Sequence, residues 1–131
     1  MGRILVAIML GITAAFACIA VAHCAAGGLP YVPGNSLTAT SPGAALEAHS
    51  IGGKAIIVLG WCVGTFVGAA VAARMGHREI DVWIVAAIVV ASALAWVATV
   101  PHGTKLMLAA LILPWLSAWP ATRLAHRWRP R

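Results

Sequence analysis

The sequence is poor in charge, and acidic residues are the scarcest of all. Of its 131 residues, 9 are Lys or Arg and 3 are Asp or Glu, which together make 9%. A soluble domain carries roughly 25% charged residues. Hydrophobic residues make up 62% of the chain, so there are too few polar side chains to cover a surface in water. This composition excludes an ordinary soluble domain, and with it a soluble nucleic-acid-binding surface.

Paired cysteines are also lacking. The three cysteines are Cys18, Cys24 and Cys62, and no C-x-x-C pair occurs. A thioredoxin-type redox motif is therefore absent, which disfavours membrane enzymes that make or use disulfides. Cys18 and Cys62 are expected at similar depth and could meet, but small buried apolar side chains are the simpler interpretation.

Four long apolar runs without any charged residue make up most of the sequence. They cover residues 4–22, 55–73, 82–100 and 106–122. A bilayer core needs about 20 helical residues, and each run is about twice as long as a barrel strand. The runs predict an all-α integral membrane protein, a single membrane domain over residues 1–131 arranged as an up-down bundle of four transmembrane helices.

The basic residues predict the orientation of this bundle. A long loop, residues 23–54, follows the first span, and a basic tail, residues 123–131, follows the last. Arg3, the loop at 74–81 and the tail fall on one side, whereas the other side has only Lys54 and Lys105. The positive-inside rule then places both termini in the cytoplasm, in the inner membrane of a bacterium, with the long loop outside.

The first span has a second interpretation. Arg3, the apolar stretch and Ala20-Val21-Ala22 resemble a signal peptide with a cleavage site before His23. The run is longer than the usual apolar core of such a peptide, about 7–15 residues, so a retained helix is favoured.

Carboxylates are missing from all four runs. Glu47, Glu79 and Asp81 are expected in loops. Proton-coupled transporters usually hold a carboxylate within the membrane. Small multidrug-resistance transporters resemble this chain in length and helix count, but they depend on a Glu in the first helix. That family is disfavoured.

Small residues recur every four positions in the second run, at Gly60, Gly64 and Gly68. They form one stripe on a helix and favour close packing against another helix, most simply within the chain. The tryptophans, Trp61 among them, lie toward the span ends, where membrane-interface anchoring is expected.

The topology brings His23, His49 and His102 to the outer side from three separate segments. Neutral imidazole binds metal ions and haem iron, so these residues are the candidate site for a metal, haem or small ligand. Histidines that bond water or backbone at the interface are the alternative. Basic residues gather on the inner side, and we call them the basic collar. The collar is expected to attract anionic lipid headgroups. It consists of Arg74, Arg78, Arg123, Arg127 and Arg129, together with His77 and His126.

The chain resembles an uncharacterised family of small bacterial four-helix inner-membrane proteins. The resemblance rests on His23 followed by prolines, the glycine row, and Pro101-His102 before the last helix, then Pro114 and Leu124-Ala125. It implies the four-helix architecture and no known activity. That family often has an acid shortly before the histidine of the first helix, and residues 18–22 have none here.

These features lead to two expectations for function. The first is a non-enzymatic small membrane protein, a helical bundle that self-associates or assists a larger membrane complex. The alternative is a membrane binding or transport protein with an outer-face histidine pocket. No pair of nucleophile and base can be placed within the runs, so an enzyme is the third possibility.

Overall fold

The computed structural model describes residues 2–26, 51–98 and 104–127. These residues form helices α1 (Gly2–Ala25), α3 (Ile51–Gly76), α4 (Glu79–Val97) and α5 (Thr104–Arg127). All four are long and apolar enough to cross a membrane. The all-helical prediction is confirmed, and the chain has the character of a multi-pass membrane protein.

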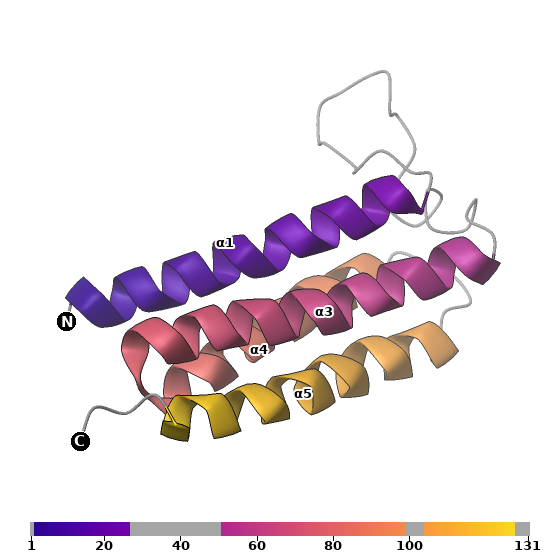
Figure 1. Cartoon of the computed structure of the whole chain (residues 1–131). Helices are drawn as coiled ribbons and strands as arrows, with labels where there is room; N and C mark the ends of the chain where they lie inside the picture. Colours follow the sequence, from indigo (N-terminus) through magenta and orange to yellow (C-terminus); the bar gives the residue numbers. More distant parts are fainter. Residues whose placement is uncertain (1, 27–50, 99–103, 128–131) are drawn as a thin grey trace.

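Successive helices run in opposite directions, so α1 begins and α5 ends at the same end of the bundle (Figure 1). We call this the arginine end, because Arg3, Arg74, Arg78, Arg123 and Arg127 lie within it. The other we call the lysine end, because it holds Lys54 and Lys105.

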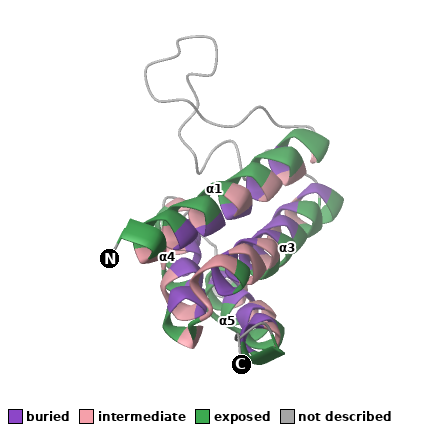
Figure 2. Ribbon diagram, turned by 60° about the vertical axis from the view of Figure 1, so that its left-hand side comes forward, coloured by how far each residue is buried: buried purple, intermediate pink, exposed green. Residues whose placement is uncertain are grey.

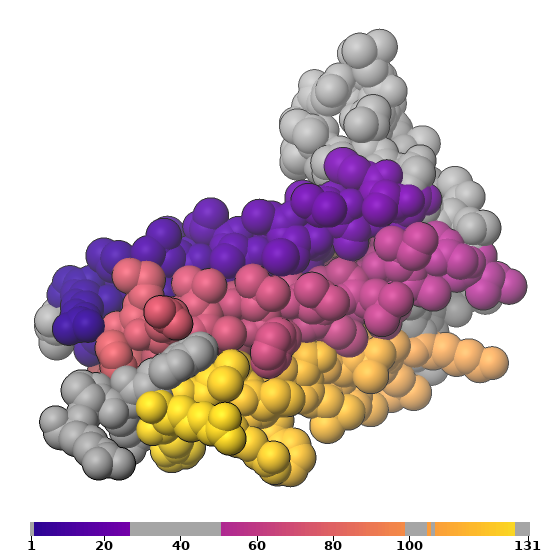
Figure 3. Space-filling view, in the orientation of Figure 1, coloured from indigo at the N-terminus to yellow at the C-terminus, as the bar shows by residue number. Residues whose placement is uncertain are grey.

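Helix α3 is the centre of the bundle, since it packs against each of the other three helices. Helix α4 also contacts α1 and α5. The pair α3 and α4 therefore separates α1 from α5, which lie along opposite sides of the molecule (Figures 1 and 3). In the space-filling view α1 follows α3 along the length of the bundle (Figure 3).

Helix α1 is buried along a single narrow stripe. Its buried residues recur every fourth position: Ala7, Gly11, Ala15, Ile19 and His23. Its other residues are exposed or partly exposed and mostly apolar, and the exposed ones form the outer face of α1 in Figure 2. Such a surface suits a helix whose outer face is surrounded by lipid chains.

The glycine row of α3 lies directly against this stripe. A Cβ atom on Gly68 would stand 2.5 Å from the carbonyl oxygen of Gly11, and one on Gly64 would stand 2.7 Å from the carbonyl oxygen of Ala15. Both separations are too short for a real side-chain contact. Only glycine lets the two backbones approach so closely, which increases dispersion and weak C–H···O contacts.

Hydroxyl groups in the helices are bonded to their own helix. Thr13, Thr65, Ser92 and Ser117 each donate a hydrogen bond to the carbonyl oxygen four residues earlier, at 2.6–2.9 Å. This local bonding meets the need to satisfy every polar group in hydrocarbon without a partner helix.

The connection between α3 and α4 is shorter than the predicted loop at 74–81, because only His77 and Arg78 lie outside the helices. His77 has φ of 59°, and its backbone N–H donates to the carbonyl oxygen of Ala73 at 3.0 Å. This is a left-handed helix cap, a position that glycine usually occupies.

The expectation that all carboxylates lie in loops is wrong for Glu79 and Asp81. Both belong to the first turn of α4, and Asp81 is fully buried. An acid in the first turn is favoured by the helix dipole, which lets the helix begin before the apolar run. Glu47 lies outside the described residues, as does most of the predicted loop at 23–54. At its edges, α1 continues through Ala25 and α3 begins at Ile51.

Candidate functional site

A pocket opens between α1, α3 and α4 in the half of the bundle nearest the lysine end. Its volume is about 270 Å³. Helices α1 and α4 supply most of its lining, and α3 contributes Trp61. The lining residues are Phe16, Ile19, Ala20, His23, Trp61, Val89, Ser92, Ala93 and Trp96.

The pocket exists because side-chain size changes along the α1 stripe. Toward the arginine end the stripe is Ala7, Gly11 and Ala15, and the helices touch through their backbones. Toward the lysine end it continues as Ile19 and His23. Here α1 still packs closely on α3, since a Cβ atom on Gly60 would collide with the side chain of Ala22. The space remains on the side of α1 that faces α4, where Ile19 and His23 do not fill it.

His23 is the most unusual residue of the pocket. Only 8% of its surface is exposed. Its Nδ1 lies 2.9 Å from the carbonyl oxygen of Ile19. A carbonyl oxygen can only accept, so this bond assigns the ring hydrogen to Nδ1 in the neutral imidazole. The other nitrogen, Nε2, is buried and has no hydrogen-bond partner in the part of the chain that the structure describes.

Trp96 of α4 holds the ring of His23 in place. The two rings meet edge to face, with centroids 5.1 Å apart and planes at 62°. This is a preferred geometry for aromatic pairs. The His23 ring is thus fixed by its own backbone on one edge and by an indole on another. The ring lines the pocket, but its Nε2 atom is itself covered.

The remaining walls are largely apolar. The hydroxyl of Ser92 lines the pocket but already donates to the carbonyl oxygen of Ile88 at 2.9 Å. Trp61 is only 3% exposed, so the prediction of an interface anchor is wrong for this residue. Its position follows from α3 being central, which turns its ring inward.

Of the three histidines in the predicted site, only His23 can be placed. His49 and His102 lie outside the described residues, so their convergence with His23 stays a prediction. Within the described ranges no group of three or more His, Cys, Asp or Glu side chains could hold a metal ion. Cys24, next to His23, is exposed.

Phe16, Trp61, Ser92 and Trp96 were not predicted as site residues. Phe16, Trp61 and Ser92 are ordinary transmembrane residues, so no local motif marks them. Trp96 carries no signal of its own either, because it lies only four residues from the end of its apolar run, residues 82–100.

A second group without a partner lies at the arginine end. Neither carboxylate oxygen of Asp81 has a hydrogen-bond partner among the described residues. The carboxyl group packs onto Gly76, the last residue of α3, where a Cβ atom would collide with it; the Ala7 side chain is close by. Asp81 is fully covered and does not line the pocket of His23.

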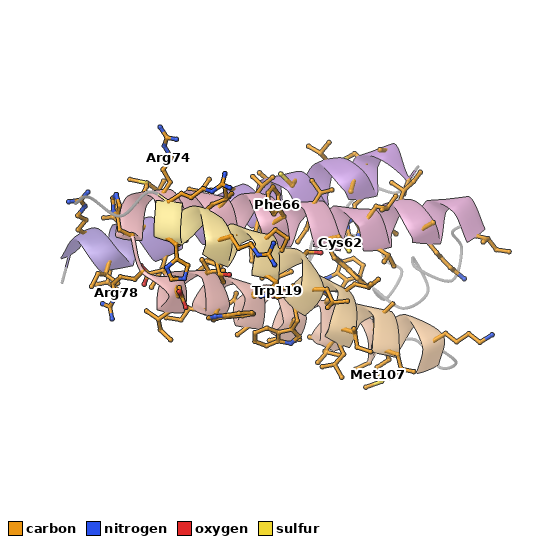
Figure 4. All side chains as sticks on the ribbon, turned by 60° about the horizontal axis from the view of Figure 1, so that its bottom comes forward. Cys62, Phe66, Arg74, Arg78, Met107 and Trp119 are labelled. Atoms are coloured by element: carbon orange, nitrogen blue, oxygen red, sulfur yellow. The ribbon has the colours of Figure 1, made fainter. Side chains whose placement is uncertain are left out.

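The arginine end also holds the predicted basic collar. Arg74, Arg78, Arg123 and Arg127 are exposed, and Arg129 lies outside the described residues. Arg74 and Arg78 extend away from the helices at this end (Figure 4). The guanidinium of Arg123 lies 4.9 Å from the ring centre of Trp119.

His126 was expected to join the arginines in attracting anionic headgroups. In the structure its Nε2 instead pairs with the carboxylate of Glu79. This contact links the end of α5 to the start of α4. His77 forms the turn between α3 and α4 through its positive φ angle.

An outward groove runs between α1 and α3 near the lysine end. It has a volume of about 450 Å³, and its lining is apolar. Cys18 lines this groove together with Gly60. Cys18 and Cys62 are both free thiols and form no disulfide.

Comparisons of the chain with models of protein families, with curated proteins and with solved structures found no match.

Proposed function

We propose that this chain is a non-enzymatic membrane protein that binds a small, mostly apolar molecule in the pocket of His23. The observation that supports this is an apolar space of about 270 Å³ between three helices, lined by His23 and by aromatic side chains. The Nε2 of His23 is buried and lacks a hydrogen-bond partner among the described residues. Burying a polar atom without a hydrogen bond is costly. An apolar molecule in this space would be buried against aliphatic and aromatic walls, which favours binding.

The pocket also suits entry from the bilayer. Phe16 is 38% exposed and Ala20 is exposed, so the α1 rim of the pocket opens toward the outside of the bundle. Phe16 is nine residues before the end of α1, roughly 13 Å at 1.5 Å per residue. At this depth the rim faces the hydrocarbon region, and an apolar ligand would arrive by lateral diffusion.

For orientation we propose both termini in the cytoplasm and the pocket half toward the outer leaflet of a bacterial inner membrane. The support is the charge bias: five described arginines lie at one end and two lysines at the other. The exposed arginines would then meet anionic headgroups, worth about 1 kcal/mol each near the surface. Side-specific labelling of single cysteines at Arg78 and Lys105 tests this, since opposite sides are expected.

The binding proposal is tested by ligand-induced stabilisation in detergent. With p-xylene at ten times its Kd, the unfolding free energy should rise by ~1.4 kcal/mol. Ala93→Leu places a larger side chain in the pocket, and this variant should lose the effect. Ala70→Leu is the matched control, because Ala70 is on α3 and does not line the pocket. A rise that is equal in wild type and Ala93→Leu would contradict binding at this site.

Self-association, or help to a larger complex, is the second candidate. The apolar groove between α1 and α3 favours it, because small residues line it and helices pack closely on small residues. Cys18 provides the test. In a variant that keeps only Cys18, oxidation in membranes should link two copies, whereas a variant that keeps only Cys62 should give little dimer. No Cys18 dimer at any expression level would contradict this candidate.

A further inference from the structure

Contacts between helices bound the pocket at both of its ends along the bundle axis. Toward the arginine end, α1, α3 and α4 meet, because a Cβ atom on Gly11 would stand 2.7 Å from the carbonyl oxygen of Gly68 and 3.1 Å from the side chain of Val85. Toward the lysine end, the ring pair of His23 and Trp96 bridges α1 and α4, with centroids 5.1 Å apart. These two rings belong to the lining residues nearest that end on their helices.

The open side of the pocket faces away from α3. Trp61, which α3 contributes to the lining, is 3% exposed and so lies on the inner side. Phe16 and Ala20 of α1 are exposed, so the space is reached from the outer surface between α1 and α4. The α1 wall from Phe16 to His23 spans roughly 10 Å at 1.5 Å per residue. Because two rings bridge the lysine end, the space suits a compact molecule without a charged headgroup.

The polar side chains of the lining are already bonded or covered. The hydroxyl of Ser92 donates to the carbonyl oxygen of Ile88 at 2.9 Å. Nδ1 of His23 lies 2.9 Å from the carbonyl oxygen of Ile19, and Nε2 of the same ring is covered. A polar group on the ligand would therefore gain no partner at His23, and burying it unpaired is costly. The lining favours a hydrocarbon.

Burial alone does not draw a hydrocarbon out of the bilayer. Lipid chains are as apolar as the aliphatic part of the lining, so transfer from lipid to the pocket removes no further surface from water. Lipid offers no aromatic contacts, whereas four of the nine lining residues carry aromatic rings: Phe16, His23, Trp61 and Trp96. Aromatic pairs gain from offset and edge-to-face contacts beyond burial. A saturated chain makes no such contacts and loses conformational freedom when it is held in place.

We infer that the ligand class is an aromatic hydrocarbon of one or two rings, which enters from the bilayer between α1 and α4. This inference rests on the proposed binding function and names its ligand class. An apolar cavity of about 150 Å³ holds benzene, so a space of about 270 Å³ accommodates a second ring. The bound rings contact Phe16, Trp61 and Trp96.

Four probes with the same number of carbon atoms separate the parts of this inference. The protein is reconstituted in nanodiscs, and the Kd of radiolabelled naphthalene is measured as a mole fraction of the lipid. Decalin, n-decane and 2-naphthol then compete for the labelled site. We expect naphthalene to bind about tenfold more tightly than decalin or n-decane. We expect 2-naphthol to bind no more tightly than naphthalene, because its hydroxyl gains no partner.

Two tryptophan variants of α4 locate the aromatic contact. Trp96→Leu removes one ring of the lining, so the preference for naphthalene over decalin should fall to about threefold. Trp83→Leu is the matched control, because the ring of Trp83 meets Trp115 and does not line the pocket. It should keep the roughly tenfold preference. The readout is a ratio of two Kd values, so a change that affects both probes alike cancels. An equal fall in both variants would overturn the inference.

The outcomes distinguish the ligand class from the binding function. Equal Kd values for naphthalene and decalin in wild type, both weakened in Ala93→Leu, would overturn the aromatic class and leave the binding pocket. Tightest binding by n-decane would make a lipid chain the occupant, and tightest binding by 2-naphthol would require an accessible polar partner. Either result would overturn the inference. If no probe bound saturably, or Ala93→Leu changed none of the Kd values, the binding function itself would fail.

Discussion

The two ends of the interface between α1, α3 and α4 each bury a polar group without a partner among the described residues, but their surroundings differ. At the arginine end, Asp81 is covered by Gly76 in a region where backbones touch. At the lysine end, His23 lines an open space of about 270 Å³, although its Nε2 atom is covered. A side chain that lines an open space can contact a ligand, whereas one that is covered on all sides cannot.

The contrast comes from side-chain size along one helix. The α1 stripe has Ala7, Gly11 and Ala15 in one half and Ile19 and His23 in the other. The same i, i+4 spacing therefore produces a close helix contact and a pocket within one interface. Substitutions that add volume should act in opposite directions in the two halves.

The largest effect is expected in the close-packed half. Ala15→Leu adds three carbons where a Cβ on Gly68 would already stand 2.7 Å from the Cβ of Ala15. Overpacking of this kind should cost about 3 kcal/mol. The measurement is the unfolding free energy in mixed micelles by titration with SDS. Gly2→Ala is the control, since a Cβ on Gly2 meets nothing within 4 Å. Equal stability of Ala15→Leu and wild type would show that α1 and α3 are not in close contact.

The next effect concerns the sealed carboxylate. Asp81→Asn keeps the shape and removes a buried charge that has no hydrogen-bond partner among the described residues. The attraction of Arg78 and the unpaired N–H groups of the new amide offset part of this gain, so stability should rise by about 1 kcal/mol. Glu79→Gln removes the same charge two residues earlier. Glu79 is half-buried and paired with His126, so that change should cost about 1 kcal/mol or less.

SDS titration of both variants checks this prediction. If Asp81→Asn were clearly less stable than wild type, the carboxylate would have a favourable partner, and the two ends of the interface would no longer differ as described.

A larger side chain in the pocket should change the unfolding free energy in the opposite direction to a larger side chain in the close-packed half. Ala93→Leu adds the same three carbons as Ala15→Leu, but next to open space, so stability without ligand should rise by about 1 kcal/mol. Both alanines are buried, so burial alone predicts a loss at each. A loss of about 3 kcal/mol in Ala93→Leu would mean that the pocket closes in the membrane.

The sequence predicts the architecture better than the site because the two depend on different information. Charge-free runs of bilayer length specify four helices regardless of their neighbours. Gly60, Gly64 and Gly68 are recognisable because a repeat of four is a property of one helix. The partner surface on α1 is less visible, since its stripe mixes Ala7, Gly11 and Ala15 with ordinary apolar residues.

The site needs three helices to be placed together. His23 was identified from its type and position, but the rings that surround it, Trp61 and Trp96, could be assigned only once α3 was known to be central. Asp81 was misplaced for a local reason. A charge at the edge of an apolar run resembles a loop residue, although the first turn of a helix accommodates an acid equally well.

The smallest effect is expected at the turn between α3 and α4, at the arginine end. His77 has φ of 59°, and its backbone N–H caps α3 by donating to Ala73. The left-handed conformation costs a residue with a Cβ atom roughly 1–2 kcal/mol. Glycine avoids this cost, but it loses more conformational entropy on folding, which offsets part of the gain. His77→Gly should therefore gain about 0.5 kcal/mol. His77→Ala keeps the strained Cβ and should show no gain, which separates the backbone effect from loss of the imidazole. If both variants were destabilised alike, the imidazole itself would hold the turn, and the arginine end would depend on side-chain contacts as the pocket does.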